Sequence, residues 1–163
     1  MIYKFEESLA HLPKADLYAE LENEARGLMA GETDPIANAA NLSALIFHRL
    51  PGLNWAGFYR LLGDVLVLGP FQGKPACLRI PLGRGVCGTA AAERVSQLVP
   101  DVHDFPGHIA CDAASRSELV VPILKDGELL GVLDLDSPDP ARFDEQDLKG
   151  CEALVCAYIE SLV

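Results

Sequence analysis

The chain has 163 residues, of which 50% are hydrophobic and 23% are charged, so we expect one domain with a substantial core and no global disorder. Its net charge of −11 repels phosphate backbones and anionic lipid, so nucleic acid and membrane surfaces are not expected as partners. No apolar run approaches the roughly 18 residues of a transmembrane helix. Glu6 and Glu7 stand where a signal peptide would be apolar. Together these features predict a cytoplasmic protein with reduced thiols.

Two helices are expected first. A helix is predicted over 15–30 from apolar residues that recur at helical spacing: Leu17, Leu21, Ala25 and Leu28. Gly31 follows as a stop signal. Asp34 is a good N-cap and Pro35 suits the first helical position, so a second, buried helix should run to about residue 49.

The middle of the chain reads as strands and turns. Residues 53–61 and 65–71 predict a hairpin through Gly63 and Asp64, and residues 76–82 are a third strand candidate. A short helix over 85–93 and a strand over 95–99 precede a long irregular loop, 100–116, and loops of that length inside a compact domain are usually functional.

A second hairpin and a last helix complete the chain. The hairpin joins 117–124 to 128–136, and the helix begins near Asp144 with one apolar stripe: Leu148, Cys151, Val155, Tyr158 and Leu162. Hairpins outnumber βαβ units, so the fold class is α+β with an antiparallel sheet, in a single domain over 1–163.

Residues 83–88, GRGVCG, match the G-x-G-x-x-G pattern of dinucleotide-binding loops. That fingerprint also needs a parallel βαβ unit, and the strands before it look like hairpins. We therefore interpret these glycines as a tight turn that can present backbone N–H groups to a ligand.

Three of the five cysteines stand in segments that resemble site architecture: Cys77, Cys87 and Cys111. Cys151 and Cys156 lie on the last helix and are interpreted as packing residues, because buried cysteine usually behaves as a small hydrophobe. No C-x-x-C pair is present, which disfavours a structural zinc site.

Cys111 shares the long loop with two histidines, His103 and His108. A nearby histidine favours the nucleophilic thiolate, whereas the neighbouring Asp112 opposes it. A buried loop thiol without chemistry, or a metal site formed by Cys111 with the two histidines, are the alternatives at this stage.

Asp134 and Asp136 lie two residues apart on a strand and should therefore share one face. A three-residue turn, 125–127, would place Glu118 opposite Asp134, whereas a two-residue turn would place it opposite Leu135, facing away. Gly127 as the third turn residue favours the first register, which predicts a cluster of Glu118, Asp134 and Asp136. Such a cluster could bind an ammonium group or donate a proton; a solvated strand end is the alternative.

Trp55, Gly57 and Tyr59 alternate onto one face of the first strand. Aromatic stripes are most often core. The glycine between the two rings predicts an open shelf that could serve as the wall of a small-ligand site.

Seven segments spread over essentially the whole chain resemble the free methionine-(R)-sulfoxide reductases, which are single GAF-domain enzymes: NWAGFY (54–59), LGPFQGK (68–74), GVCG (85–88), VPDVH (99–103), FPGHIACD (105–112), SELVVPI (117–123) and GVLDLDS (131–137). The resemblance implies a GAF-like antiparallel sheet of about six strands with flanking N- and C-terminal helices, usually in a homodimer. It implies reduction of free L-methionine (R)-S-oxide to L-methionine, through a cysteine sulfenic acid and an intramolecular disulfide that thioredoxin reduces. No metal or organic cofactor is expected.

The resemblance also implies residue roles. Cys111 matches the catalytic nucleophile, while Cys77, the favoured first partner, and Cys87 match resolving thiols. The implied substrate-binding residues are the acidic pocket and the aromatic wall: Glu118, Asp134, Asp136, Trp55 and Tyr59. A GAF sensory module that binds a small ligand, a thiol redox switch without turnover, and a metal-binding domain are the alternative functions.

Overall fold

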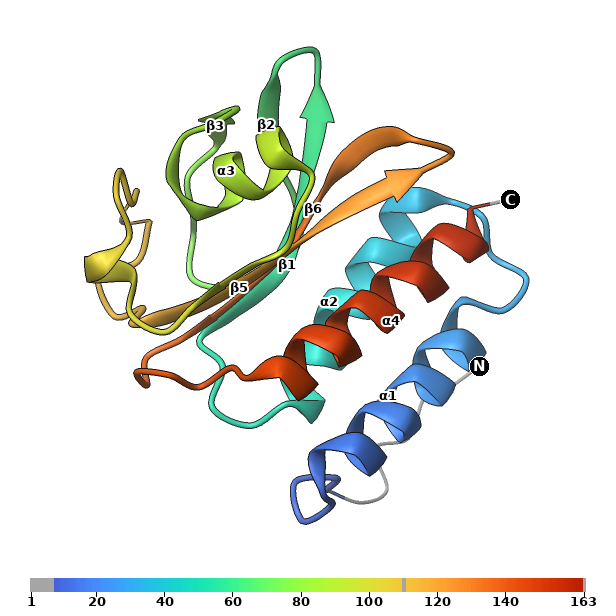
Figure 1. Ribbon diagram of the computed structural model, residues 1–163. Helices are drawn as coiled ribbons and strands as arrows, with labels where there is room; N and C mark the ends of the chain where they lie inside the picture. The colour runs from blue at the N-terminus through green and yellow to red at the C-terminus, as the bar shows by residue number, and fades with distance from the viewer. Residues whose placement is uncertain (1–7, 110, 163) are drawn as a thin grey trace.

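The computed structural model describes residues 8–109 and 111–162. Within them lie four α-helices, a 3-10 helix and six strands (Figure 1): α1 (Lys14–Met29), α2 (Pro35–Arg49), β1 (Trp55–Leu62), β2 (Val65–Gly73), β3 (Arg79–Pro81), α3 (Gly85–Glu93), β4 (Gln97–Val99), η1 (Val102–Asp104), β5 (Ser117–Lys125), β6 (Glu128–Ser137) and α4 (Glu145–Ser161). Glu6 and Glu7, on which the absence of a signal peptide was argued, lie outside the described residues.

The ends of α2 and α4 follow directly from their capping residues. The Asp34 side chain accepts a hydrogen bond from the Ala37 N–H, and Pro35 occupies the first helical position of α2. Asp144 and Asp147 form a reciprocal capping box at the start of α4. Both predicted helix starts are confirmed.

The sheet has the strand order β3-β2-β1-β6-β5-β4, and every pairing in it is antiparallel. The predicted α+β class is therefore confirmed. Because β3 and β4 are opposite edges of the sheet, α3 between them crosses its face and belongs to no parallel βαβ unit. The rejection of a dinucleotide fingerprint at 83–88 is correct for that reason.

The third strand is shorter than predicted. It covers Arg79–Pro81 rather than 76–82, since the chain leaves β2 after Gly73 and runs irregularly to residue 78. Cys77 consequently lies in a loop beside the sheet and not at the start of a strand.

The register predicted for the second hairpin is wrong, although the predicted face is correct. Asp126 and Gly127 both have positive φ, 52° and 81°, and form a two-residue turn that pairs Lys125 with Glu128. One extra residue in β6 then shifts the pairing, so that Glu118 lies opposite Asp136 instead of Asp134. The bulge restores the alternation that a two-residue turn alone would have reversed.

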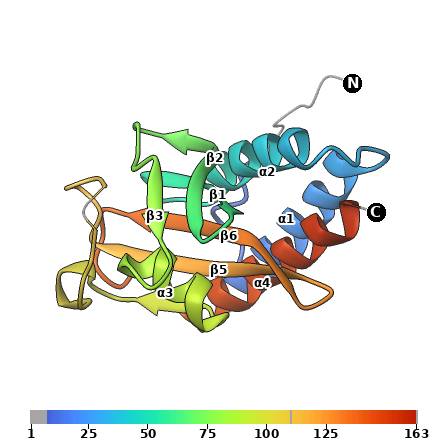
Figure 2. The same ribbon diagram turned by 90° about the horizontal axis from the view of Figure 1, so that it is seen from above.

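The two faces of the sheet have different coverings (Figures 1 and 2). The helices α2 and α4 pack against one face, and α1 packs outside them against both. The helix-side core takes alternate strand residues, among them Phe58, Leu119, Val121, Leu133 and Leu135. The intervening residues face α3 and the long loop, and this second face carries the candidate site.

The cysteines of α4 differ from each other. Cys151 is fully buried, with its Sγ 3.9 Å from the Tyr18 hydroxyl of α1, and its predicted packing role is confirmed. Cys156 is exposed, so interpreting it as a packing residue was wrong. Tyr18 also donates a hydrogen bond to Asp147 over 2.8 Å, which ties α1 to α4.

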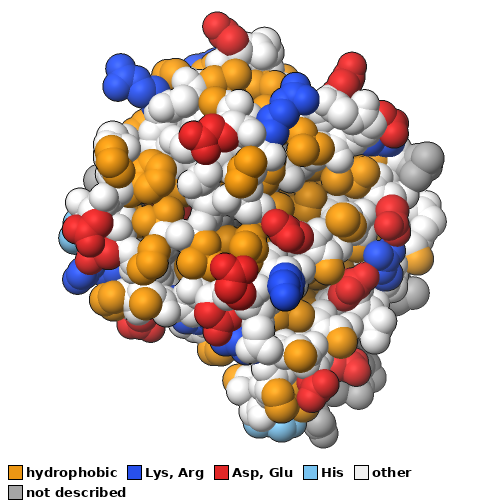
Figure 3. Space-filling view, viewed as in Figure 1, with side chains coloured by type: hydrophobic (Ala, Val, Ile, Leu, Met, Phe, Trp, Pro, Cys, Tyr) orange, Lys and Arg blue, Asp and Glu red, His pale blue; other side chains and the backbone are white. Residues whose placement is uncertain are grey.

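On the face seen in Figure 3, acidic side chains are dispersed among apolar and basic ones and do not gather into a single patch. No helix in the described ranges is long and apolar enough to cross a membrane.

Candidate active site

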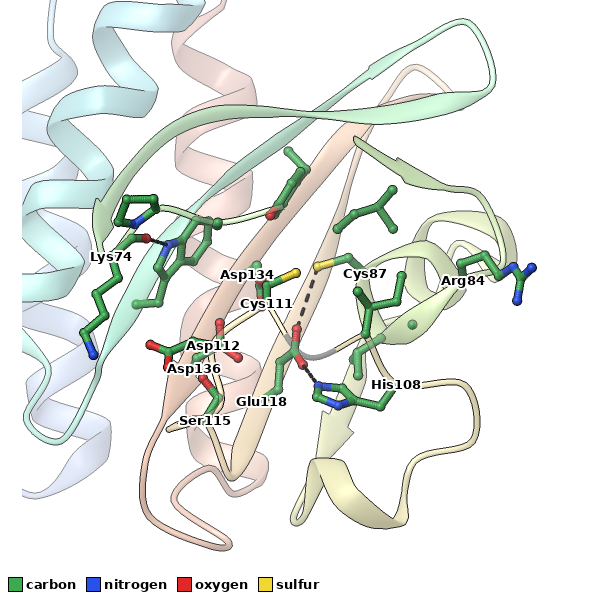
Figure 4. A pocket seen from close by; sticks show the side chains of 18 residues that line it. Lys74, Arg84, Cys87, His108, Cys111, Asp112, Ser115, Glu118, Asp134 and Asp136 are labelled. Carbon is green, nitrogen blue, oxygen red and sulfur yellow. Dashed lines mark hydrogen bonds and ion pairs between the residues drawn. The ribbon is translucent and has the colours of Figure 1, made fainter. Parts of the chain in front are cut away.

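A pocket opens on the sheet face that α3 and the 100–116 loop cover (Figure 4). Its walls come from β1, β5, β6, the start of α3, and the loops that carry Lys74 and Cys111. The eighth residue predicted for the site from sequence, Cys77, is bonded to Cys111, and the other seven line the pocket directly: Trp55, Tyr59, Cys87, Cys111, Glu118, Asp134 and Asp136.

A disulfide joins Cys77 to Cys111 at this pocket, with their Cα atoms 5.5 Å apart. That separation is ordinary for a disulfide, so the two loops meet without displacing the sheet. Both cysteines are half-buried and therefore within reach of a partner in solution. Ala110, which precedes Cys111, lies outside the described residues.

The loops that carry the two sulfurs are fixed by hydrogen bonds to the sheet. The Tyr59 hydroxyl donates to the Cys77 carbonyl over 3.0 Å, and Trp55 Nε1 donates to the Lys74 carbonyl over 3.2 Å. On the other side, Asn54 Nδ2 donates to the Ser115 hydroxyl over 3.1 Å. The aromatic side chains thus position the disulfide loop as well as lining the pocket.

The shelf expected over Gly57 does not exist. A Cβ on Gly57 would collide with Phe71 of β2, whose ring stacks on Trp55 at 5.2 Å between centroids. Trp55 and Tyr59 also stack, at 5.9 Å. The glycine is therefore needed for close approach of β2, beside a register shift in the β1–β2 pairing, and the wall is a continuous aromatic surface.

Three carboxyl groups gather on the floor of the pocket. Glu118 and Asp134 are buried, at 6% and 5% exposure, and Asp136 is half-buried opposite Glu118. Burial raises the pKa of Glu118 and of Asp136 well above the usual range, and it raises the pKa of Asp134 to about 6. Three carboxylates this close cannot all be ionised without a cation, so the cluster holds protons at neutral pH.

Cys87 lies in the first turn of α3, with its Sγ 3.8 Å from Glu118 Oε1. Burial, reinforced by the charges of Asp134 and Glu118, raises the pKa of this thiol well above its usual value. Cys87 is therefore a neutral thiol beside the acids, not an activated nucleophile.

Sequence reasoning did not assign three cationic or titratable side chains of the wall to substrate binding: Lys74, Arg84 and His108. His108 Nε2 lies 3.9 Å from Glu118 Oε2, and burial lowers the pKa of this imidazole. Neither partner is charged at neutral pH, so the contact is not an ion pair. The only sequence signal for these residues was that each lies close along the chain to a predicted site motif.

The alternative of a metal site formed by His103, His108 and Cys111 is not supported. Cys111 is in the disulfide, and the His103 side chain is 62% exposed beside Asp101. Among residues 8–109 and 111–162, the donors that do come together are Cys87, Glu118 and Asp134.

Comparison with known proteins agrees with this architecture. Residues 35–156 match the GAF domain family. A free methionine-R-sulfoxide reductase of Escherichia coli is 56% identical over 150 residues, which cover 92% of this chain and 90% of that protein. The corresponding protein of Saccharomyces cerevisiae is 45% identical, over 94% of this chain and 90% of its own. An X-ray structure of free methionine-R-sulfoxide reductase from Neisseria meningitidis, in complex with its substrate, superposes with a TM-score of 0.90 at 44% identity, covering 99% of this chain and 95% of that one.

Proposed function

The chain belongs to the free methionine-R-sulfoxide reductases of the GAF fold, and on that premise we propose that it reduces free L-methionine (R)-S-oxide to L-methionine with its own thiols. The observation that carries the proposal is the Cys77–Cys111 pair at the mouth of a pocket whose floor is a buried, proton-holding carboxyl cluster. A sulfoxide reductase needs both parts, because a thiol must attack sulfur while the departing oxygen receives a proton.

In the reduced enzyme, the Cys111 thiolate attacks the sulfoxide sulfur. The oxygen is protonated and transferred, which releases methionine and leaves Cys111 as a sulfenic acid. The Cys77 thiol then attacks the Cys111 sulfur, and the hydroxyl leaves with the thiol proton as water, which forms the disulfide. An external dithiol, which we take to be thioredoxin, returns both cysteines to thiols and is itself oxidised to a disulfide.

Glu118 is our candidate for the proton donor. Its carboxyl is buried and its pKa is raised well above the usual range by burial, so it is protonated at neutral pH. His108 lies beside Glu118, on the loop side of the pocket. From there it can pass a proton back to this carboxyl group after turnover.

Asp134 and Asp136 suit the substrate ammonium. Asp134 is the member whose pKa is raised only to about 6, so it is mostly ionised at neutral pH and can pair with an incoming cation. A methionine residue within a protein has no free ammonium, and the pocket would therefore select against it. In Figure 4, Lys74 extends on the same side as Asp112 and Asp136, which suits the α-carboxylate on the same carbon atom.

Cys87 is proposed as a second relay thiol. It is close to the carboxyl cluster but is not part of the disulfide, so its role follows the first exchange. Trp55 and Tyr59 would contact the S-methyl end of the substrate. No metal or organic cofactor enters this reaction, and we expect a cytoplasmic homodimer.

An epimer-resolved assay tests the function. Purified protein is incubated with racemic free methionine sulfoxide and dithiothreitol, and the two epimers are quantified separately. We expect only the R epimer to disappear, with one methionine formed for each. Binding without methionine release would instead indicate a GAF sensory module, and oxidation of Cys77 and Cys111 without consumption of either epimer would indicate a thiol switch.

The thiol roles are tested by single turnover of the reduced protein. Cys111→Ser should release no methionine, whereas Cys77→Ser should release one per site and then stop with thioredoxin as the reductant. Methionine release by Cys111→Ser would overturn the nucleophile assignment. Continued thioredoxin turnover in Cys77→Ser would show that Cys87 can substitute for Cys77 as the resolving thiol.

A further inference from the structure

The pocket brings one soft and two hard ligand atoms together. Cys87 Sγ and one carboxylate oxygen each of Glu118 and Asp134 all lie within 4.8 Å of one another. The three residues come from α3, β5 and β6, and all are buried, with exposures of 4%, 6% and 5%. They are therefore a pre-formed group inside the fold and not chance neighbours on a surface.

A second observation indicates that this group lacks a positively charged partner. Asp134 Oδ1 is buried and makes no hydrogen bond with any residue that the structure describes. Leaving a buried carboxylate oxygen unpaired is unfavourable, because the oxygen has lost its hydrogen bonds to water without replacement. Asp134 lines the pocket, so the carboxyl group that carries this oxygen lies at the wall of a space that a small cation could enter.

From these contacts we propose that Cys87, Glu118 and Asp134 form a binding site for Zn²⁺ or a similar thiol-binding divalent cation. Thiolate favours zinc over magnesium and calcium, which prefer oxygen ligands alone. Zinc distances of about 2.3 Å to sulfur and 2.0–2.2 Å to oxygen place neighbouring tetrahedral ligands between 3 and 4 Å apart. The present spacing needs only small side-chain rotations to reach that geometry.

His108 offers a fourth ligand. Its Nε2 already lies 3.9 Å from Glu118 Oε2, and the side chain is 15% exposed at the pocket wall. A histidine binds metal as the neutral imidazole, the form that burial of this side chain favours. The complete set would be one thiolate, two carboxylates and one imidazole.

The site exists in the oxidised protein, because Cys87 is not part of the Cys77–Cys111 disulfide. It also overlaps the carboxyl cluster that we propose for the substrate ammonium. The cation and free methionine sulfoxide should then exclude each other; this second step rests on the proposed function, whereas metal binding does not.

The experiment uses the oxidised protein in a Cys156→Ser background, which removes the exposed thiol of α4. Zn²⁺ is titrated by calorimetry, and Co²⁺ is added separately to detect the thiolate-to-metal absorption band. We expect one Zn²⁺ per chain. Cys87→Ser and Asp134→Asn should each weaken binding at least 100-fold, whereas Asp112→Asn, a pocket carboxylate outside the group, should leave the affinity unchanged.

Two results would overturn the metal site: no thiolate band with Co²⁺ in the parent protein, or Zn²⁺ affinity that neither Cys87→Ser nor Asp134→Asn changes. The parent band reports thiolate ligation even if one variant fails to fold.

A final titration measures binding of free methionine sulfoxide to the oxidised protein with and without saturating Zn²⁺. Loss of sulfoxide binding at saturating Zn²⁺ supports the overlap, and equal binding refutes it. A protein that binds Zn²⁺ but never the sulfoxide contradicts the proposed function while the metal site stands.

Discussion

Replacing Glu118 by glutamine is the sharpest test of the proposed proton donor. The amide has nearly the same shape and removes the exchangeable carboxyl proton, so the pocket should keep its volume. Glu118 is 6% exposed, and Asp136 lies opposite it across the β5–β6 pairing. We expect the rate of methionine release to fall strongly in the variant, with a smaller change in KM.

The magnitude follows from the state of the carboxyl group. An ordinary glutamic acid, with a pKa near 4.3, is protonated in only about one molecule in 500 at pH 7. Burial raises the pKa of Glu118 far enough to keep its proton, so the fold restores most of that factor. General acids typically contribute about 100- to 10,000-fold, which corresponds to about 3–5 kcal/mol of barrier.

The assay is single turnover with the reduced protein at saturating substrate, followed by quantification of methionine. This format separates the chemical step from reduction of the disulfide. Glu128→Gln is the matched control, since it makes the same side-chain change at the exposed start of β6, far along the strand from the pocket. A Glu118→Gln rate within about threefold of the Glu128→Gln rate would refute Glu118 as the acid, because a general acid contributes at least about 100-fold.

Further predictions concern stability and substrate binding. The pKa of Asp134 in the folded protein, about 6, lies above its ordinary value of 3.8, so the stability of the wild type falls as the pH rises through that window. The free energy of unfolding of Asp134→Asn, measured with urea, should therefore gain up to about 3 kcal/mol relative to wild type between about pH 4 and pH 7.5. A difference between the two proteins that stays constant with pH would contradict this. Lys74→Gln should raise KM for the free substrate about tenfold, whereas Arg84→Gln should change it little, and equal effects would argue against carboxylate recognition by Lys74. In thermal unfolding, Gly150→Ala should destabilise by about 1–3 kcal/mol because its Cβ would enter the tyrosine ring of α1, while Gly27→Ala, with open space around it, should be neutral or stabilising.

The sequence was most informative where a local rule determines the structure. The N-caps Asp34 and Asp144 fixed the starts of two helices, because capping depends on neighbours within one turn. Strand alternation placed Asp134 and Asp136 on one face for the same reason. The pairing partner of Glu118 could not be predicted, since a single extra residue in β6 shifts the register by one place.

The site was harder to predict where it depends on contacts between distant segments. The sequence could not show that Phe71 fills the space over Gly57, because that contact joins two strands across a register shift. The exposure of Cys156 depends on how α4 is oriented on the sheet, which its apolar stripe only partly determines. The grouping of Cys87 with the acids was likewise invisible, as it requires α3 to cross the sheet face between opposite edges.

The carboxyl cluster also explains why the two faces of one sheet are so unequal. Toward the helices, Leu119, Leu133 and Leu135 are fully buried in an apolar core that can bear the stability of the domain. Toward the pocket, the residues between them include carboxyl groups whose burial is unfavourable unless they hold protons or meet a cation. A substrate that brings an ammonium supplies such a cation, so an arrangement that destabilises the free protein becomes favourable on binding.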